Sequence, residues 1–141
     1  MTFARESEVP VERSRAHIEQ VLAKYGATHF AYGSAPFEAR IMFEANGRRV
    51  RFILPLATPK GSKYLTEKQQ AQFLRTRWRC LLLAITAKLE SVESGISTFE
   101  EEFMAHIMLP NGKSVGEHAI PYIADAYSNK KMPPLLGFGG G

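Results

Sequence analysis

The clearest pattern in the chain is an alternation of apolar and polar residues on both sides of Asn46-Gly47. Alternation over two short segments predicts two β-strands, each with one buried face. Asn-Gly is a preferred sequence for a two-residue type I′ turn, so it predicts a hairpin and fixes its register. The register gives four pairs: Glu44 with Arg49, Phe43 with Val50, Met42 with Arg51, and Ile41 with Phe52.

The two faces of this hairpin differ in composition. One face is predicted to belong to the core: Ala39, Ile41, Phe43, Val50, Phe52 and Leu54. The other face has three arginines with two apolar residues between them, and two acids beside them: Arg40, Met42, Arg49, Arg51 and Ile53, with Glu38 and Glu44. This half-apolar face with three guanidinium groups is the strongest functional hint in the sequence. The alternative is a solvated face, or one that the first helix covers.

Helical periodicity predicts one helix before the hairpin and a longer one after it. The first helix begins at Pro10 and ends near Tyr25, where Gly26 is a natural stop, and a short strand over residues 28–32 follows it. The long helix begins at Thr66 and runs to about Ser94. Its first residues match the capping-box pattern S/T-x-x-E/Q, and its apolar stripe includes Trp78.

The remaining third of the chain contains two more capping-box patterns. The first, Ser97-x-x-Glu100, predicts a helix that continues through Met108. The second, Ser114-x-x-Glu117, precedes an interrupted helix over about 120–127, and the residues from Ser128 onward are predicted to be loop. The order is therefore α-β-β-β-α-α-α. It predicts an α+β fold, in which the long helix covers a three-stranded antiparallel sheet and further helices lie toward the C-terminus.

Length and composition are those of one globular domain. We expect a disordered N-terminus over residues 1–10, a single α+β domain over 11–128 and a C-terminal tail over 129–141, within 141 residues of 45% hydrophobic composition. No apolar run approaches the roughly 20 residues that span a bilayer, and the first ten residues do not read as a signal peptide. One cysteine excludes an intramolecular disulfide, so a cytoplasmic location is expected.

The charges are unevenly distributed along the chain. Through Arg79 there are 14 Lys and Arg against 7 Glu, whereas from Cys80 onward there are 4 Lys against 7 acids. A basic first half indicates a polyanion partner, or contacts between subunits that place basic and acidic halves together. Two solvated surfaces without a partner would give the same distribution.

Nucleic-acid binding needs several cations in one place, with flat apolar surface on which bases can stack. We expect the arginine-bearing hairpin face, the loop after it and one stripe of the long helix to supply both. The predicted contacts are Arg40, Arg49, Arg51, Met42, Ile53, Lys60, Lys63, Tyr64, Arg75 and Arg79. If the helix covers the inner face of the sheet, however, its exposed side points away from the arginines of the hairpin.

Other chemistry has weaker support in the sequence. Glu102 and His106 stand one helical turn apart and His118 follows, but no complete zinc or di-iron motif is present. Cys80 is expected to be a buried, inert thiol inside the long helix, and there is no phosphate-binding loop or nucleophile motif. Trp78 lies between two arginines, yet its spacing predicts core rather than stacking. We therefore expect no enzyme activity, cofactor or metal site.

The stretch from Arg77 to Lys113, followed by Val115-Gly-Glu117, is similar to a family of small proteins from tailed phages and prophages. The likeness covers most of residues 9–136. No activity is assigned to that family, so it implies no site residue, but a phage setting implies handling of single-stranded DNA, interference with a host complex or a structural role. We expect a phage-type protein that binds single-stranded DNA without sequence preference, as a homo-oligomer in the host cytoplasm. The alternatives are a protein-binding module, such as an inhibitor of a host complex, and a structural scaffold.

Overall fold

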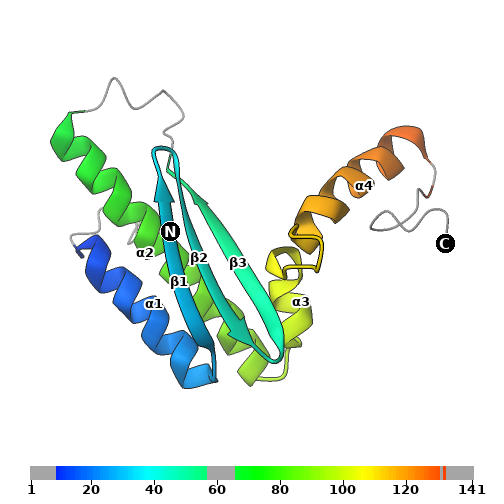
Figure 1. The fold of residues 1–141 in the computed structure, drawn as a ribbon, viewed down its shortest axis with the longest axis horizontal. Coiled ribbons are helices and arrows are strands. Elements are labelled where there is room, and N and C mark those ends of the chain that lie inside the picture. Colours follow the sequence, from blue (N-terminus) through cyan, green and yellow to red (C-terminus); the bar gives the residue numbers. More distant parts are fainter. Residues whose placement is uncertain (1–8, 57–65, 131, 133–141) are drawn as a thin grey trace.

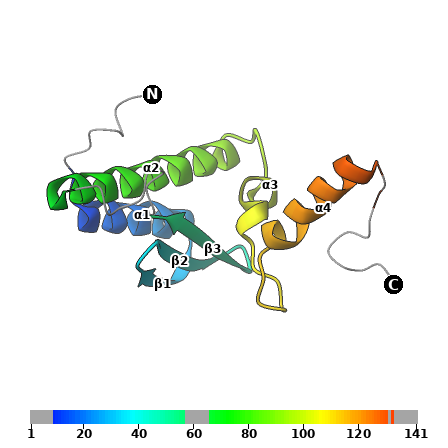
Figure 2. The same cartoon turned by 90° about the horizontal axis from the view of Figure 1, so that it is seen from above.

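The computed structural model describes residues 9–56, 66–130 and 132, and it confirms the α+β fold (Figure 1). A three-stranded sheet is covered on one face by an N-terminal helix and a long central helix, and shorter helices follow (Figure 2). The elements are α1 (Val11–Tyr25), β1 (Thr28–Ala35), β2 (Glu38–Ala45), β3 (Arg48–Pro55), α2 (Glu67–Glu93), α3 (Phe99–Phe103), the 3₁₀ helix η2 (Met104–His106) and α4 (Val115–Asn129). Among the described residues, no helix is both long and apolar enough to cross a bilayer.

The sheet is antiparallel in the order β1-β2-β3, and the predicted hairpin register is confirmed at all four pairs. Asn46 and Gly47 both have positive φ, 51° and 71°, as a type I′ turn requires. The first strand is longer than predicted. It continues to Ala35, which pairs with Glu38, so that Pro36 and Phe37 alone connect β1 to β2.

Helices α1 and α2 pack against each other on one face of the sheet (Figure 2). Capping explains where α2 begins and where α1 ends. Thr66 and Gln69 form the predicted capping box of α2, and Gly26 ends α1 in the left-handed conformation. The opposite face of the sheet is not covered by α1, so that alternative is wrong. Met42 and Ile53 on this outer face are 36% and 38% exposed.

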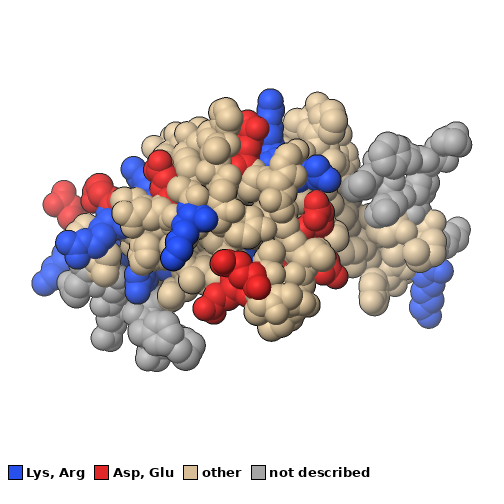
Figure 3. All heavy atoms as spheres, turned by 90° about the horizontal axis from the view of Figure 1, so that it is seen from below, with Lys and Arg blue, Asp and Glu red and all other residues tan. Residues whose placement is uncertain are grey.

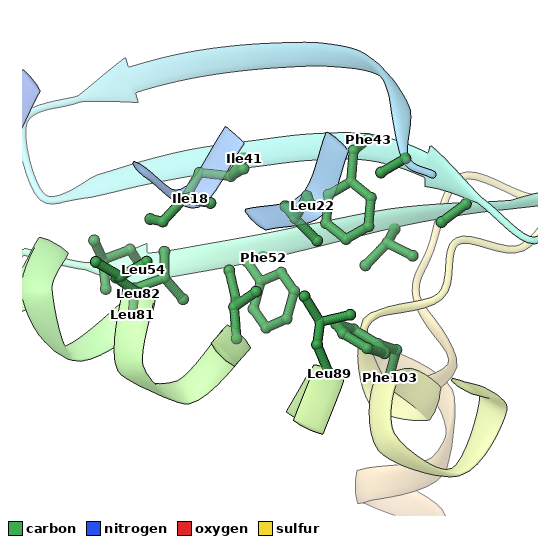
Figure 4. Close-up of a cluster of buried hydrophobic side chains, with 14 of the residues drawn as sticks. Ile18, Leu22, Ile41, Phe43, Phe52, Leu54, Leu81, Leu82, Leu89 and Phe103 are labelled. Carbon is green, nitrogen blue, oxygen red and sulfur yellow. The ribbon is translucent and has the colours of Figure 1, made fainter. Parts of the chain in front are cut away.

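The core lies between the two helices and the inner face of the sheet (Figure 4). All six hairpin residues assigned to the core are buried, and so is Trp78. Ile18 and Leu22 enter the core from α1 and Ile85 from α2, all fully buried. Phe103 adds its ring edge-on to Phe43 and Phe52, and this contact holds α3 against the sheet.

The predicted cap of the third helix is wrong by one residue. The Thr98 side chain accepts the Glu101 amide, and the Glu101 carboxylate accepts the Thr98 amide. This cap is the one formed because it buries both Phe99 and Phe103, which lie one turn apart. The helix is also shorter than predicted. After η2 the chain becomes extended, and the Met108 amide donates to the Arg49 carbonyl at 2.8 Å along the outer edge of β3.

The last helix is continuous rather than interrupted. The predicted Ser114 and Glu117 capping box begins α4, which includes Pro121 and continues to Asn129, so the prediction of loop from Ser128 is wrong by two residues. In both ribbon views α4 projects away from α1 and α2, while its start contacts η2 and pairs with Arg51 of β3 (Figures 1 and 2). Gly116 is its only buried residue, and a Cβ there would lie 2.8 Å from the Ala105 carbonyl oxygen.

Candidate nucleic-acid interface

A hollow of about 420 Å³ lies on the outer face of the sheet. Its floor is formed by the central part of β2 and β3, and its wall by the chain that follows η2. Four of the residues predicted from the sequence line it together: Arg40, Met42, Arg49 and Arg51. His29 from β1 also lines it, as do residues of the segment that follows η2: Met108, Leu109, Pro110 and Gly112. The structure therefore brings three cationic groups and apolar surface to one place.

The three arginines differ in how free they are. Arg49 is exposed, and its guanidinium has no ion pair or hydrogen bond within the described part of the chain. Arg40 donates from Nε to the Glu38 carboxylate at 2.8 Å, in a pair that is largely exposed. An exposed pair of this kind contributes about 0–1 kcal/mol, so an anionic ligand can replace Glu38 at small cost.

Arg51 has a different role from the one predicted. Its side chain is only 10% exposed and donates to the Glu117 carboxylate at 2.5 Å. Glu117 also accepts the Ser114 backbone amide, and this bond together with Arg51 lowers the pKa of Glu117 to about 2. Arg51 thus connects the sheet to the first turn of α4. It borders the hollow but is not free for a phosphate.

Acidic residues also border the hollow. Glu44 lines it, with its carboxylate 3.8 Å from the His29 ring. Seen from below, lysines and arginines gather toward one end of the molecule beside a few acids, and further acids lie over its middle (Figure 3). Arg49 and Arg40 are the two cations available at the hollow.

The other predicted contacts lie on α2, in a neighbouring groove or outside the described residues. Lys60, Lys63 and Tyr64 lie outside the described residues. Arg75 and Arg79 belong to α2, which lies on the opposite side of the sheet from the hollow (Figure 2).

Ile53 faces a neighbouring groove on the outer side of the sheet, which it shares with Arg51 and the first turns of α4. The contacts predicted from the sequence are thus divided between two faces of the molecule.

The remaining sequence candidates have structural partners. Cys80 is exposed, so the prediction of a buried thiol is wrong. Trp78 is core, with the Arg15 guanidinium 4.8 Å from the centre of its ring. His106 stacks on Phe52 with ring centres 4.0 Å apart, and burial lowers its pKa. No group of three or more His, Cys, Asp or Glu side chains comes together within the ranges that the structure describes.

Three consecutive acids, Glu100 to Glu102, lie in the first turn of α3, and each of their carboxylates contacts the chain itself. Glu100 lies 3.5 Å from Arg48, Glu101 completes the cap of α3, and Glu102 accepts a bond from Ser97 at 2.7 Å. These contacts explain the acidic run by local structure, without a partner.

Two parts of the hollow were not predicted from the sequence. His29 sits where the pairing of β1 with β2 is irregular, with φ of 58°, and no residue pattern indicates such an irregularity. The second part is the wall, which lies beside β3 because Ile107 pairs with Val50, and these two residues are far apart in the chain.

Comparison with known proteins adds no family to this description. No protein-family model, no curated protein and no solved structure matches the chain.

Proposed function

We propose that this protein binds single-stranded nucleic acid, without base preference, at the hollow on the outer face of its sheet. The observation that carries the proposal is the position of Arg49 and Arg40 on either side of the exposed Met42, in one concave site. Guanidinium groups bind phosphate oxygens well, and an apolar floor accepts the face of any base. A site that contacts phosphates and the faces of bases, but not their edges, does not distinguish one base from another.

The hollow favours a single strand over a duplex because of its size. A volume of about 420 Å³ accepts one or two unstacked bases, whereas the bases of a duplex are paired and turned inward. Pro110 and Leu109 offer apolar surface on the wall, so a base resting on Met42 would also contact the wall. Arg51 acts here as a positioning residue, because its pair with Glu117 joins β3 to α4.

Salt dependence tests the proposal directly. With two phosphates neutralised by Arg40 and Arg49, affinity for a single strand should fall about sevenfold between about 50 and 200 mM salt. Fluorescence anisotropy of a labelled oligothymidylate of about 20 nucleotides measures this change. Replacing both arginines by glutamine should remove most of the binding and flatten the salt dependence.

A charge-matched control separates the hollow from net charge. Arg13 and Lys24 are exposed on α1, away from the hollow, and replacing both by glutamine removes the same charge. Binding should survive in this control. Equal losses in the two double variants, or no binding at low salt, would show that the hollow is not a nucleic-acid site.

One observation favours a second candidate function, a protein-binding module. Helix α4 exposes Ile120, Ile123 and Tyr127 by 64%, 52% and 84%. Large exposed apolar residues on one helix are typical of protein interfaces. A phage origin and a role in a phage life cycle stay predictions from sequence resemblance.

A further inference from the structure

Helix α4 has an apolar stripe that no described part of the chain covers. Ile120, Ile123 and Tyr127 are spaced by three and four residues, which places them on one side of the helix. Gly116 lies on the same side one turn earlier, where it packs against Ala105. The side of α4 that packs against Ala105 at the start of the helix therefore becomes an exposed apolar surface in the later turns.

A helix in this situation gains little stability on its own. Fifteen residues are marginal for an isolated helix in water, and Pro121 removes one backbone hydrogen bond. Packing of the amphipathic face usually supplies what such a helix lacks. The stripe is thus expected to be covered when α4 is fully formed.

Charge favours a second copy of the chain as the cover. Asp125 lies two residues from both Ile123 and Tyr127, so helical geometry places it on the opposite side of α4. Glu117 is bonded to Arg51 of the body. Two copies that meet through this stripe keep their acids apart, because the two acids of α4, Glu117 and Asp125, both lie off the stripe.

Shape also favours a second copy. If two α4 helices run antiparallel with Ile123 near the two-fold axis, Ile120 lies opposite Tyr127 of the partner subunit. Beside Ile120 an open groove of about 520 Å³, lined by Ile53, Ala105 and Pro121, separates α4 from the sheet. The partner's Tyr127 would enter this groove, and the two-fold axis repeats the contact on the other subunit.

We infer that the protein forms an antiparallel homodimer through the apolar stripe of α4, with Tyr127 of each subunit in the groove beside Ile53 of the other. The inference is independent of nucleic-acid binding. The stripe supplies about 400 Å² per subunit, roughly half of what a standard stable interface buries on each side. The dimer should therefore be weak, with a dissociation constant of about 10–100 µM.

Sedimentation equilibrium of the full chain over about 5–500 µM tests the inference. The average mass should rise from that of the 15.8 kDa monomer toward twice that value. Ile123→Glu should raise the dissociation constant at least about 100-fold, because each dimer then buries two unpaired carboxylates. Ile96→Glu makes the same change at an 81% exposed residue outside α4 and should leave the constant within about twofold.

Further variants keep the test decisive if Ile123→Glu disturbs folding. Tyr127→Ala removes an 84% exposed side chain and should weaken the dimer at least about tenfold. A chain that stops after Met132 should still dimerise. A monomer throughout the concentration range, equal effects of Ile123→Glu and Ile96→Glu, or dimers that form only after the last residues are removed would each overturn the inference. The last result would show that the chain's own end covers the stripe.

Discussion

Replacing Phe103 by alanine should destabilise the fold strongly, because this side chain joins α3 to the sheet. It is fully buried, stacks on Phe99 at 4.7 Å between ring centres, and meets Phe43 and Phe52 edge-on at 6.3 and 6.1 Å. Loss of the buried ring costs about 2 kcal/mol in transfer free energy. A cavity of about 100 Å³ at about 24 cal/mol per Å³ adds about 2 kcal/mol more.

The expected loss is therefore about 4 kcal/mol out of a total of about 5–15 kcal/mol. Urea denaturation followed by circular dichroism should show the midpoint move down by about 2 M, with a similar slope. Phe37→Ala is the matched control, because Phe37 is 62% exposed, and it should cost less than about 0.5 kcal/mol. A loss below about 1.5 kcal/mol for Phe103→Ala, or similar losses for both variants, would refute the packing described here.

Three further predictions concern the attachment of α4 and the edge of β3. The Glu117 carboxylate should stabilise the folded state above pH 4.5, and this stabilisation should disappear as pH falls toward its folded-state pKa of about 2. In acid titrations of the free energy of unfolding, Glu117→Gln should lack this loss of stability between pH 4.5 and about 2. Burial lowers the pKa of His106 below its ordinary 6.5, so stability should also fall as pH drops below 6.5, and His106→Phe should remove that loss. Gly116→Ala should weaken docking of α4 by about 1–3 kcal/mol, seen as faster hydrogen exchange in α4, because its Cβ would meet Ala105; unchanged exchange would contradict this.

Local signals in the sequence were enough to predict most of the fold. The Asn46-Gly47 turn fixes the hairpin register by itself, and the capping boxes at Thr66 and Ser114 mark the true starts of α2 and α4. The cap of α3 was harder to predict, because Ser97 and Thr98 both precede a glutamate by three residues. Burial of Phe99 and Phe103 decides between them, and burial depends on the assembled core.

The candidate site was only partly predictable for the same reason. Alternation along the hairpin placed Arg40, Arg49 and Arg51 on one face, and the structure agrees that they line one hollow. No local pattern indicates that Arg51 pairs with Glu117, which is 66 residues further along the chain. Long-range pairs of this kind arise from the docking of α4 and leave no local pattern.

The most direct test of the account is an NMR titration of the isotope-labelled protein with a short oligothymidylate. We predict that the backbone amides around Met42, Arg49 and Gly112 shift together, with one affinity, and that the exposed side of α2 near Arg75 and Arg79 does not shift. Shifts confined to α2, or none at low salt, would contradict the assignment of the hollow as the binding site.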